Sequence, residues 1–574
     1  MKIWLWVLGA VLAVVLVGLA GVYRWFNPPA PPAQLFFNGT VVTMDPAQPE
    51  ASAMLVKRGE IVALGEVNVL RQQVSRDVQV IDLEGGTLMP GFIDAHGHFP
   101  GEGLSAVAVD ANSPPIGDLY SIDTLLERLR LLAQRRPEGP LLAYGFDDTT
   151  IGEQRYPTRD ELDTVSDSRP VMVMHISGHL GVLNSAGLAA MSIPEEVQDP
   201  QGGFYGRDAD GRLNGLLAET AFSPVRASML ALSGMDGLRV LNRASHQYLA
   251  RGITFAQNGL ADPASLRALK PALRLGVIPL RLSLWPDAEA ETLRGSGALT
   301  LPGSDRIHLG PVKLVADGSL QGYTGFLSEP YYTVPEDYPP DYLGFPTLSG
   351  ADLTEQVTRF HCQDRQVAIH ANGDAAITLA LDAVAAARQQ CPTIRKQPVL
   401  IHAQTSTTAQ LERMKALEVI PSFFNAHVYY WGDRHRDIFL GPERARRISP
   451  LAEAEQLGLR FTLHADSPIV PYQPLLMVWN AVHRETSSGA TLGAGQSVNV
   501  ERALQAVTVD AARQLGVQDR VGQLRAGMLA DLVWLDRDPR DNIAQWRDIQ
   551  VRGTWIGGVR RYPDGVEDPA LSAQ

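Results

Sequence analysis

The stretch Leu88-Met-Pro-Gly-Phe-Ile-Asp-Ala-His-Gly-His98 decides how this chain of 574 residues is organised. Its apolar part ends at Asp94, and two histidines follow with one residue between them, His96 and His98. Because side chains alternate along a strand, both imidazoles point to the same side and can hold one metal ion. A lone His-x-His pair is weak evidence. It becomes strong if other strands also end in metal ligands.

From about residue 87 to residue 516, strand-like runs alternate with helical stretches, which predicts a parallel sheet covered by helices. The eight candidate strands are Gly91–Ala95, Gly252–Gln257, Leu280–Leu284, Val312–Ala316, Gln366–Ile369, Val399–Ile401, Ile420–Phe424 and Leu459–Leu463. Eight such units predict an α/β fold with a (β/α)8 TIM-like barrel. A long insertion of about residues 99–249 follows the first strand, where it is placed to cover the mouth of the barrel.

Both ends of the chain carry short β-rich runs and no catalytic constellation. Leu35–Phe37, Thr40–Met44 and Ala53–Val56 precede the barrel, and Gly522–Asp536 and Val551–Val559 follow it. Turn residues such as Asn38-Gly39 separate these runs, as expected of short strands. We predict one small β-sandwich domain built from residues 34–86 and 517–565, enclosing a hydrolase barrel at residues 87–516.

Functional residues of such a barrel lie at the C-terminal ends of its strands. In chain order these positions hold His96, His98, Lys313, His370, His402 and Asp466. Imidazole and carboxylate are the ligands of hydrolytic zinc-type sites, which leave a position open for water. A protonated Lys313 cannot bind a metal, whereas a carboxylated Lys313 could bridge two ions. The residues alone leave both states open.

Several motifs resemble those of the metal-dependent amidohydrolase superfamily, in particular its amidohydrolase-3 branch with the YtcJ-like proteins. The motifs are Pro90–His98, Gly178-His179 with Asn184-Ser185, Gly203–Glu219, Val312–Ser319, Ile369–Asp374, His402–Gln404, Ala465–Pro468 and Gly527–Val533. The resemblance covers nearly everything from Leu35 to Pro563. One departure is His464-Ala465-Asp466, where the family usually has Gly-Ser-Asp, and we do not predict His464 to be a ligand.

The resemblance implies that a divalent metal, with zinc the expected ion, is bound as one or two ions per chain. The implied ligands are His96, His98, His370, His402 and Asp466, with a carboxylated Lys313 as the bridging ligand. The implied activity is hydrolysis of carbon–nitrogen bonds other than peptide bonds, in an amide or cyclic amide. Metal binding lowers the pKa of a bound water, and Asp466 beside that water would act as the general base.

Two residues of the insertion, His179 and Glu219, are weaker candidates for binding the small-molecule substrate, and a structural role is equally open for both. Two alternative functions remain. One is a deaminase with a single metal ion, in which Lys313 stays uncarboxylated. The other is a non-catalytic, membrane-tethered regulatory or binding protein, although its site would be expected to have lost ligands.

The composition excludes other classes of protein. The net charge of −13 argues against a nucleic-acid-binding protein, which would carry basic stripes. Two cysteines, Cys362 and Cys391, are too few for a disulfide framework or a Cys-rich zinc site. We interpret them as two core thiols rather than as one bridge. A homodimer stays open.

The N-terminus departs from this composition. Ile3–Val22 is an unbroken apolar run, long enough to cross a bilayer of ~30 Å as a helix. We therefore predict an N-terminal transmembrane helix that anchors an extracytoplasmic, periplasmic body. A cleaved signal peptide followed by secretion is the alternative. Residues 1–33 then comprise this segment and the stiff proline-rich spacer Pro28–Pro32.

Overall fold

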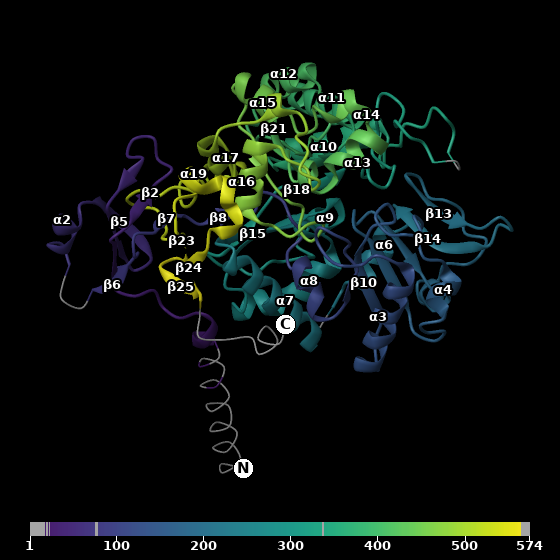
Figure 1. Cartoon of the computed structure of the whole chain (residues 1–574), viewed down its shortest axis with the longest axis horizontal. Helices are drawn as coiled ribbons and strands as arrows, with labels where there is room; N and C mark the ends of the chain where they lie inside the picture. Colours follow the sequence, from purple (N-terminus) through teal and green to yellow (C-terminus); the bar gives the residue numbers. More distant parts are fainter. Residues whose placement is uncertain are drawn as a thin grey trace, which may run out of the picture.

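The computed structural model describes residues 18, 21, 23–74, 78–232, 234–335 and 338–563. Strands from the two chain ends, purple and yellow in Figure 1, lie at one side of a central α/β unit. The strands of the insertion, such as β13 (Gly203–Arg207) and β14 (Leu213–Glu219), lie at the opposite side.

The eight predicted strands of the central unit are present, and every pairing between them is parallel. They are β8 (Phe92–Ile93), β15 (Ile253–Ala261), β16 (Arg281–Pro286), β17 (Ile307–Leu309) with β18 (Val312–Val315), β19 (Val367–Ala371), β20 (Val399–His402), β21 (Ile420–Phe423) and β22 (Thr462–Leu463). They form two sheets, in the orders β17-β16-β15-β8 and β18-β19-β20-β21-β22. This corrects the expectation of one continuous barrel sheet.

The chain passes from one sheet to the other through Gly310 and Pro311. Pro311 has no N–H to donate to a neighbouring strand, which explains why the fourth strand of the unit is divided there into β17 and β18, the second of which matches the predicted Val312–Ala316. At the other edge, the N–H of His98 after β8 donates to the carbonyl of Ser467 after β22, at 2.6 Å. The first and the last strand are therefore joined close to the quoted histidines.

Helices between the strands cover the sheets on the outside. They include α8 (Pro263–Leu275), α9 (Ala288–Gly295), α10 (Gly350–Cys362), α11 (Asp374–Gln390), α12 (Thr408–Ala416), α15 (Leu451–Gln456), α16 (Pro474–His483), α17 (Val500–Ala506) and α18 (Val509–Gln514). In α11 an alanine-rich sequence favours the helix. Its Ile377, Leu381 and Val384 recur at helical spacing and are buried, so this face packs on the strands.

The insertion is a mixed sheet with its own helices. In sheet order its strands are β13, β14, β12 (Leu180–Leu183), β11 (Val171–His175), β10 (Leu141–Phe146) and β9 (Val109–Asp110). Its helices include α3 (Ile122–Arg135), α4 (Arg159–Asp163), α5 (Ser185–Ala190), α6 (Ser223–Met229) and α7 (Gly234–Ala250). Asp147 after β10 accepts from Arg434 at 2.7 Å and from Trp431 at 3.2 Å, both in α13 (His427–Arg434). This buried pair fixes the insertion on the central unit.

Strands from both chain ends share one sheet. Its order is β25 (Val559–Tyr562), β24 (Val551–Ile556), β23 (Leu532–Leu535), β7 (Thr87–Pro90), β2 (Thr40–Val42) and β3 (Glu50–Ala51). A second sheet holds β5 (Glu60–Gly65), β4 (Ala53–Lys57), β1 (Ala33–Phe37) and β6 (Gln79–Asp82). Phe36 of one sheet packs edge-on against Trp555 of the other, with ring centroids 5.4 Å apart. The exact domain boundaries stay predictions.

The predicted N-terminal transmembrane helix is not supported. None of the helices within the described residues is long and apolar enough to cross a membrane. This finding overturns the anchor proposed for Ile3–Val22 and the membrane-anchored location derived from it. Most of that run lies outside the described residues, which include only Gly18 and Gly21 of it. An apolar run of sufficient length is a necessary condition for spanning a bilayer and does not by itself establish a spanning helix.

The interpretation of the cysteines as two core thiols is wrong. Cys362 and Cys391 form a disulfide with a Cα–Cα distance of 5.5 Å. Cys362 ends α10, and Cys391 follows the last residue of α11. Both helices run antiparallel to β19, which lies between them in the chain, so their C-terminal ends meet at the same side.

We expect the double variant Cys362→Ser, Cys391→Ser to unfold more easily than the unmodified protein. The bridge closes a loop with a sequence separation of 29 residues. A loop of that length corresponds to a loss of roughly 3.6 kcal/mol in the free energy of unfolding. Urea titration measures this loss, and a reducing agent should reproduce it in the unmodified protein but not in the variant. Equal stability of all samples would contradict the prediction.

Candidate metal centre

Five of the six predicted metal ligands lie at or just after the C-terminal ends of the parallel strands, and Lys313 lies near the start of its strand. The six are His96 and His98 after β8, Lys313 in β18, His370 in β19, His402 at the end of β20 and Asp466 after β22. Because all these strands run in the same direction, the structure brings the six side chains together. All of them are buried except His98, whose side chain is 31% exposed.

Asp466 lies between three of the histidines. Its Oδ1 is 3.1 Å from Nε2 of His96 and 3.1 Å from Nε2 of His98. Its Oδ2 is 3.9 Å from Nε2 of His402. The carboxylate and two of these imidazoles, those of His96 and His402, offer ligand atoms within 4.8 Å of one another. This set of nitrogen and oxygen donors matches the preferences of zinc.

A second close contact joins His370 and His402, with 3.0 Å between Nδ1 of His370 and Nε2 of His402. Nε2 of His370 lies 3.1 Å from the carbonyl of Gly318, 3.5 Å from a carboxylate oxygen of Asp317 and 3.1 Å from the amide nitrogen of Asn372. The amide of Asn372 donates to Gly318 at 2.8 Å, and a proton on Nε2, with Gly318 and Asp317 as its acceptors, leaves a lone pair on Nδ1. The residues therefore fit a cation between the two rings.

Lys313 reaches the same centre although it stands near the start of its strand. Its Nζ is 3.0 Å from Nε2 of His96. Burial lowers the pKa of Lys313 to about 7, and the nearby charge of Asp466 opposes this shift. An amine with this pKa is partly uncharged at neutral pH, which is the state that reacts with carbon dioxide.

The backbone of the quoted motif is held by Asp94. The N–H of His96 donates to Oδ1 of Asp94 at 3.2 Å, and the hydroxyl of Tyr248 donates to its Oδ2 at 3.1 Å. A Cβ at position 97 would lie 2.4 Å from the same carboxylate. Only glycine fits there, so the spacing of His96 and His98 depends on Gly97.

Two of the six residues have left-handed backbone conformations, His402 at φ 73° and Asp466 at φ 52°. Such conformations cost side-chain-bearing residues on the order of 1 kcal/mol or more, and they occur where the surroundings impose them. At the ends of β20 and β22 they turn both side chains toward the centre.

The electrostatics of the centre favour metal ligands in their binding state. Burial holds the pKa values of His96, His370 and His402 well below that of free histidine, so these imidazoles are neutral. Burial would raise the pKa of Asp466, but His96 and His98 outweigh burial and hold the pKa well below its usual range. Neutral imidazoles and an ionised carboxylate are the forms that bind a metal.

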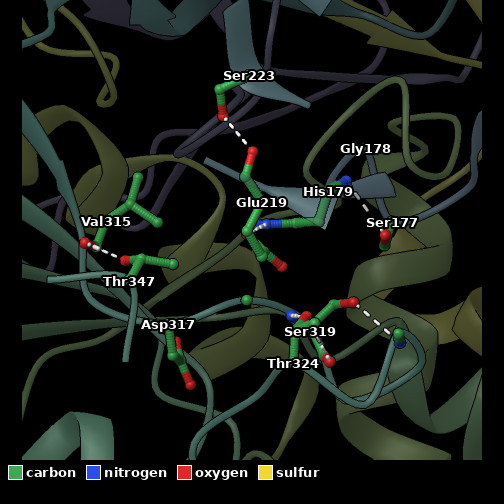
Figure 2. A network of polar contacts seen from close by, with 12 residues as sticks. Ser177, Gly178, His179, Glu219, Ser223, Val315, Asp317, Ser319, Thr324 and Thr347 are labelled. Atoms are coloured by element: carbon green, nitrogen blue, oxygen red, sulfur yellow. Dashed lines mark hydrogen bonds and ion pairs between the residues drawn. The ribbon is translucent and has the colours of Figure 1, made fainter. Parts of the chain in front are cut away.

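Figure 2 shows His179 and Glu219, the two weaker candidates, side by side at the edge of the insertion. Nδ1 of His179 is 2.7 Å from Oε2 of Glu219, and the ring of His179 lies 5.0 Å from that of His370. Oε1 of Glu219 is buried and has no hydrogen-bond partner among the described residues. A Cβ at Gly318 would lie 2.0 Å from this oxygen, so a glycine is required where the insertion meets the strand ends.

Two residues near the centre were not predicted. Nε2 of His464 is 3.1 Å from Nδ1 of His402, and the spacing of His464 and Asp466, the same as in His96 and His98, is the signal that could have identified it. Burial is the main cause that lowers the pKa of His98 and of Lys313, and the charge of Arg226 in α6 adds to both shifts. Nothing in the sequence around Arg226 distinguishes it from an ordinary helix residue.

A cavity of about 370 Å³ lies between the insertion and the segment that follows β18. It is lined by Gly202, Gly203, Phe204, Tyr338, Tyr342, Phe345 and Pro346. Pro346 forms a β-bridge with Asp317, whose carboxylate lies beside His370. The wall of the cavity is therefore largely aromatic, and one part of it belongs to the strand end next to the histidines.

Comparison with known families decides the assignment. The profile of the Amidohydrolase family matches residues 79–562, which is most of the chain. The chain belongs to the amidohydrolase family. The resemblance inferred from the motifs is confirmed. As an amidohydrolase the protein is a metal-dependent hydrolase that cleaves C–N amide bonds in small-molecule substrates.

Two curated proteins and one solved structure resemble the chain over nearly its whole length. N-substituted formamide deformylase of Arthrobacter pascens is 29% identical, over 92% of this chain and 98% of the relative. The amidohydrolase YtcJ of Bacillus subtilis is 26% identical, over 92% of this chain and 99% of the relative. A metal-dependent hydrolase from Pyrococcus horikoshii has a similar crystal structure, with a TM-score of 0.71, 25% identity and coverage of 88% and 98%.

Proposed function

We propose that His96, His98, His370, His402 and Asp466 hold divalent metal, with zinc the expected ion. We further propose that Lys313 is carboxylated and bridges two ions. The observation that carries this proposal is the cluster of six donors, five of them buried, with its neutral imidazoles and ionised carboxylate. The low pKa of Lys313 supports the carboxylated form.

The chemistry of such an ion is to lower the pKa of a water molecule and to polarise the carbonyl of the substrate. The remaining steps belong to residues of the chain. Asp466 accepts a proton on its carboxylate during attack and returns it to the leaving nitrogen. His179, held by Glu219, faces the centre from the insertion and positions the substrate. The insertion covers the centre and keeps bulk water out of it, which strengthens these interactions.

For the substrate, we propose amides with a small acyl group and an apolar substituent on nitrogen, such as N-substituted formamides. The buried ligands leave little room on the acyl side, and the aromatic-lined cavity beside Asp317 suits an apolar amine. The relative from Arthrobacter pascens carries the name of such an activity. The predicted homodimer and the single-metal deaminase remain to be tested.

We expect the purified enzyme to hydrolyse N-benzylformamide faster than N-benzylacetamide, and N-benzylacetamide faster than N-benzylbenzamide. Each enlargement of the acyl group should lower kcat/KM by roughly 10- to 100-fold, because a tight pocket rejects added carbons. Benzylamine is the product in all three cases, so one assay for this amine compares them directly. A higher kcat/KM for N-benzylbenzamide than for N-benzylformamide would contradict the proposal that the site accepts only a small acyl group.

The variant Phe204→Ala tests the amine side. Phe204 lines the aromatic cavity, so its loss should raise KM for N-benzylformamide and leave KM for N-methylformamide unchanged. Equal changes in KM for both substrates would contradict the proposal that this cavity binds the substituent on the amide nitrogen.

A further inference from the structure

His464 contacts the centre from behind its ligands. It follows β22, is fully buried, and places Nε2 3.1 Å from Nδ1 of His402. Its other nitrogen, Nδ1, is 2.9 Å from the hydroxyl of Ser422 in β21. Distances alone do not say which nitrogen carries the proton. The hydrogen bonds beyond Ser422 settle this, because they end at a group that can only accept.

That group is the carbonyl of Ala95, inside the quoted motif. Nε2 of Gln514, in α18, donates to it at 2.7 Å, which fixes the orientation of the amide. Oε1 of Gln514 then faces the hydroxyl of Thr462 at 2.6 Å. Because an amide oxygen can only accept, Thr462 donates its hydroxyl proton to Gln514.

The direction of every other bond follows. The hydroxyl of Thr462 has no second proton, so at 2.8 Å it accepts from Ser422. Ser422 has then used its own proton and accepts from Nδ1 of His464. Nε2 of His464 is therefore bare, and it accepts from Nδ1 of His402. This leaves the lone pair of His402 on Nε2, the nitrogen that faces His370 and Asp466.

We propose that His464 is a positioning residue that holds His402 in the tautomer and orientation needed to bind metal through Nε2. It does so at the end of a hydrogen-bonded chain that runs from Ala95 through Gln514, Thr462 and Ser422. This inference rests on the proposed metal centre. The chain also joins β8, β20, β21 and β22, so it couples His96 to His402 across the edge where the first and last strands meet.

The test measures metal affinity by competition with a chromophoric chelator, beginning with the metal-free protein and Zn²⁺. Partners that orient a metal-binding histidine typically contribute about 10- to 100-fold in affinity. We expect His464→Leu to lose affinity in this range, because Nδ1 of His402 then has no acceptor. His464→Gln should regain part of the loss, because its amide oxygen can accept the same proton.

Two substitutions away from the ligands extend the test. Ser422→Ala and Thr462→Val remove hydroxyl groups of the chain and should also lower the affinity, by less than His464→Leu. His361→Leu is the matched control, because His361 is equally buried but lies in α10, outside the chain of hydrogen bonds. Melting temperatures of the metal-free variants show whether each one is folded.

Unchanged affinity in folded Ser422→Ala, Thr462→Val and His464→Leu would overturn the proposal, and so would an equal loss in His361→Leu. Folded His464→Gln that regains none of the lost affinity would also overturn the proposal, because the hydrogen-bond acceptor would then not be what matters. A partial or full regain supports it. If the unmodified protein binds no Zn²⁺, the proposed metal centre itself fails, which is a distinguishable result.

Discussion

Asp466→Asn should lower kcat by about 10²- to 10⁴-fold, the usual contribution of a general base, while metal content stays near that of the unmodified enzyme. Asparagine keeps one oxygen that can bind metal, but at neutral pH it does not accept a proton. Asp466 is the carboxylate that lies 3.1 Å from both His96 and His98. Hydrolysis of N-benzylformamide and metal analysis of the same sample measure the two quantities.

Asp519→Asn is the control for this variant. The side chain of Asp519 is 84% exposed and pairs weakly with Arg525 at 3.8 Å, so its replacement should change neither quantity. If Asp466→Asn retains normal kcat, Asp466 does not move the proton. If it loses metal and activity together, Asp466 acts only as a ligand.

If Lys313 is the proposed bridging ligand, Lys313→Ala should reduce the metal content from the proposed two ions per chain to one or none and abolish most of the activity. The substitution removes the amine that would carry the bridging carboxylate and leaves a space beside His96. A small acid such as acetate or propionate can enter that space. We therefore expect it to restore part of the metal content and activity, in proportion to its concentration.

Lys270→Ala is the control, because Lys270 is a partly exposed lysine of α8 whose amine donates a hydrogen bond to the hydroxyl of Thr300. An unmodified protein that binds one ion per chain, together with an active Lys313→Ala variant, would favour the deaminase alternative. Lys313 would then be an uncarboxylated amine.

Much of the central unit was predictable because the spacing of apolar residues and the turn residues between apolar runs are local properties of the sequence. The apolar runs that end at His370 and His402 became β19 and β20 with nearly the predicted bounds. The division into two sheets was not predictable from apolar character, since it depends on Pro311 lacking an N–H. The ligand set could be gathered from the sequence because parallel strands place their C-terminal ends together.

Other features depend on the arrangement of elements and not on any one stretch. Cys362 and Cys391 are separated by 29 residues in the sequence, and they meet because α10 and α11 end at the same side of β19. His464 was set aside because its role requires His402, Ser422 and Gln514, which lie far apart in the sequence. The length of the apolar N-terminal run predicts a transmembrane helix, but none of the helices in the described part of the chain is long and apolar enough to cross a membrane.

The sheet shared by both chain ends has a consequence for synthesis on the ribosome. β7 is translated early, but its antiparallel partner β23 emerges only after all six candidate ligands. At 5 to 20 residues per second, the wait is roughly 20 to 90 s. During that time the exposed edge of β7 is open to other chains. We expect the nascent protein to need a chaperone until residue 535 has left the exit tunnel.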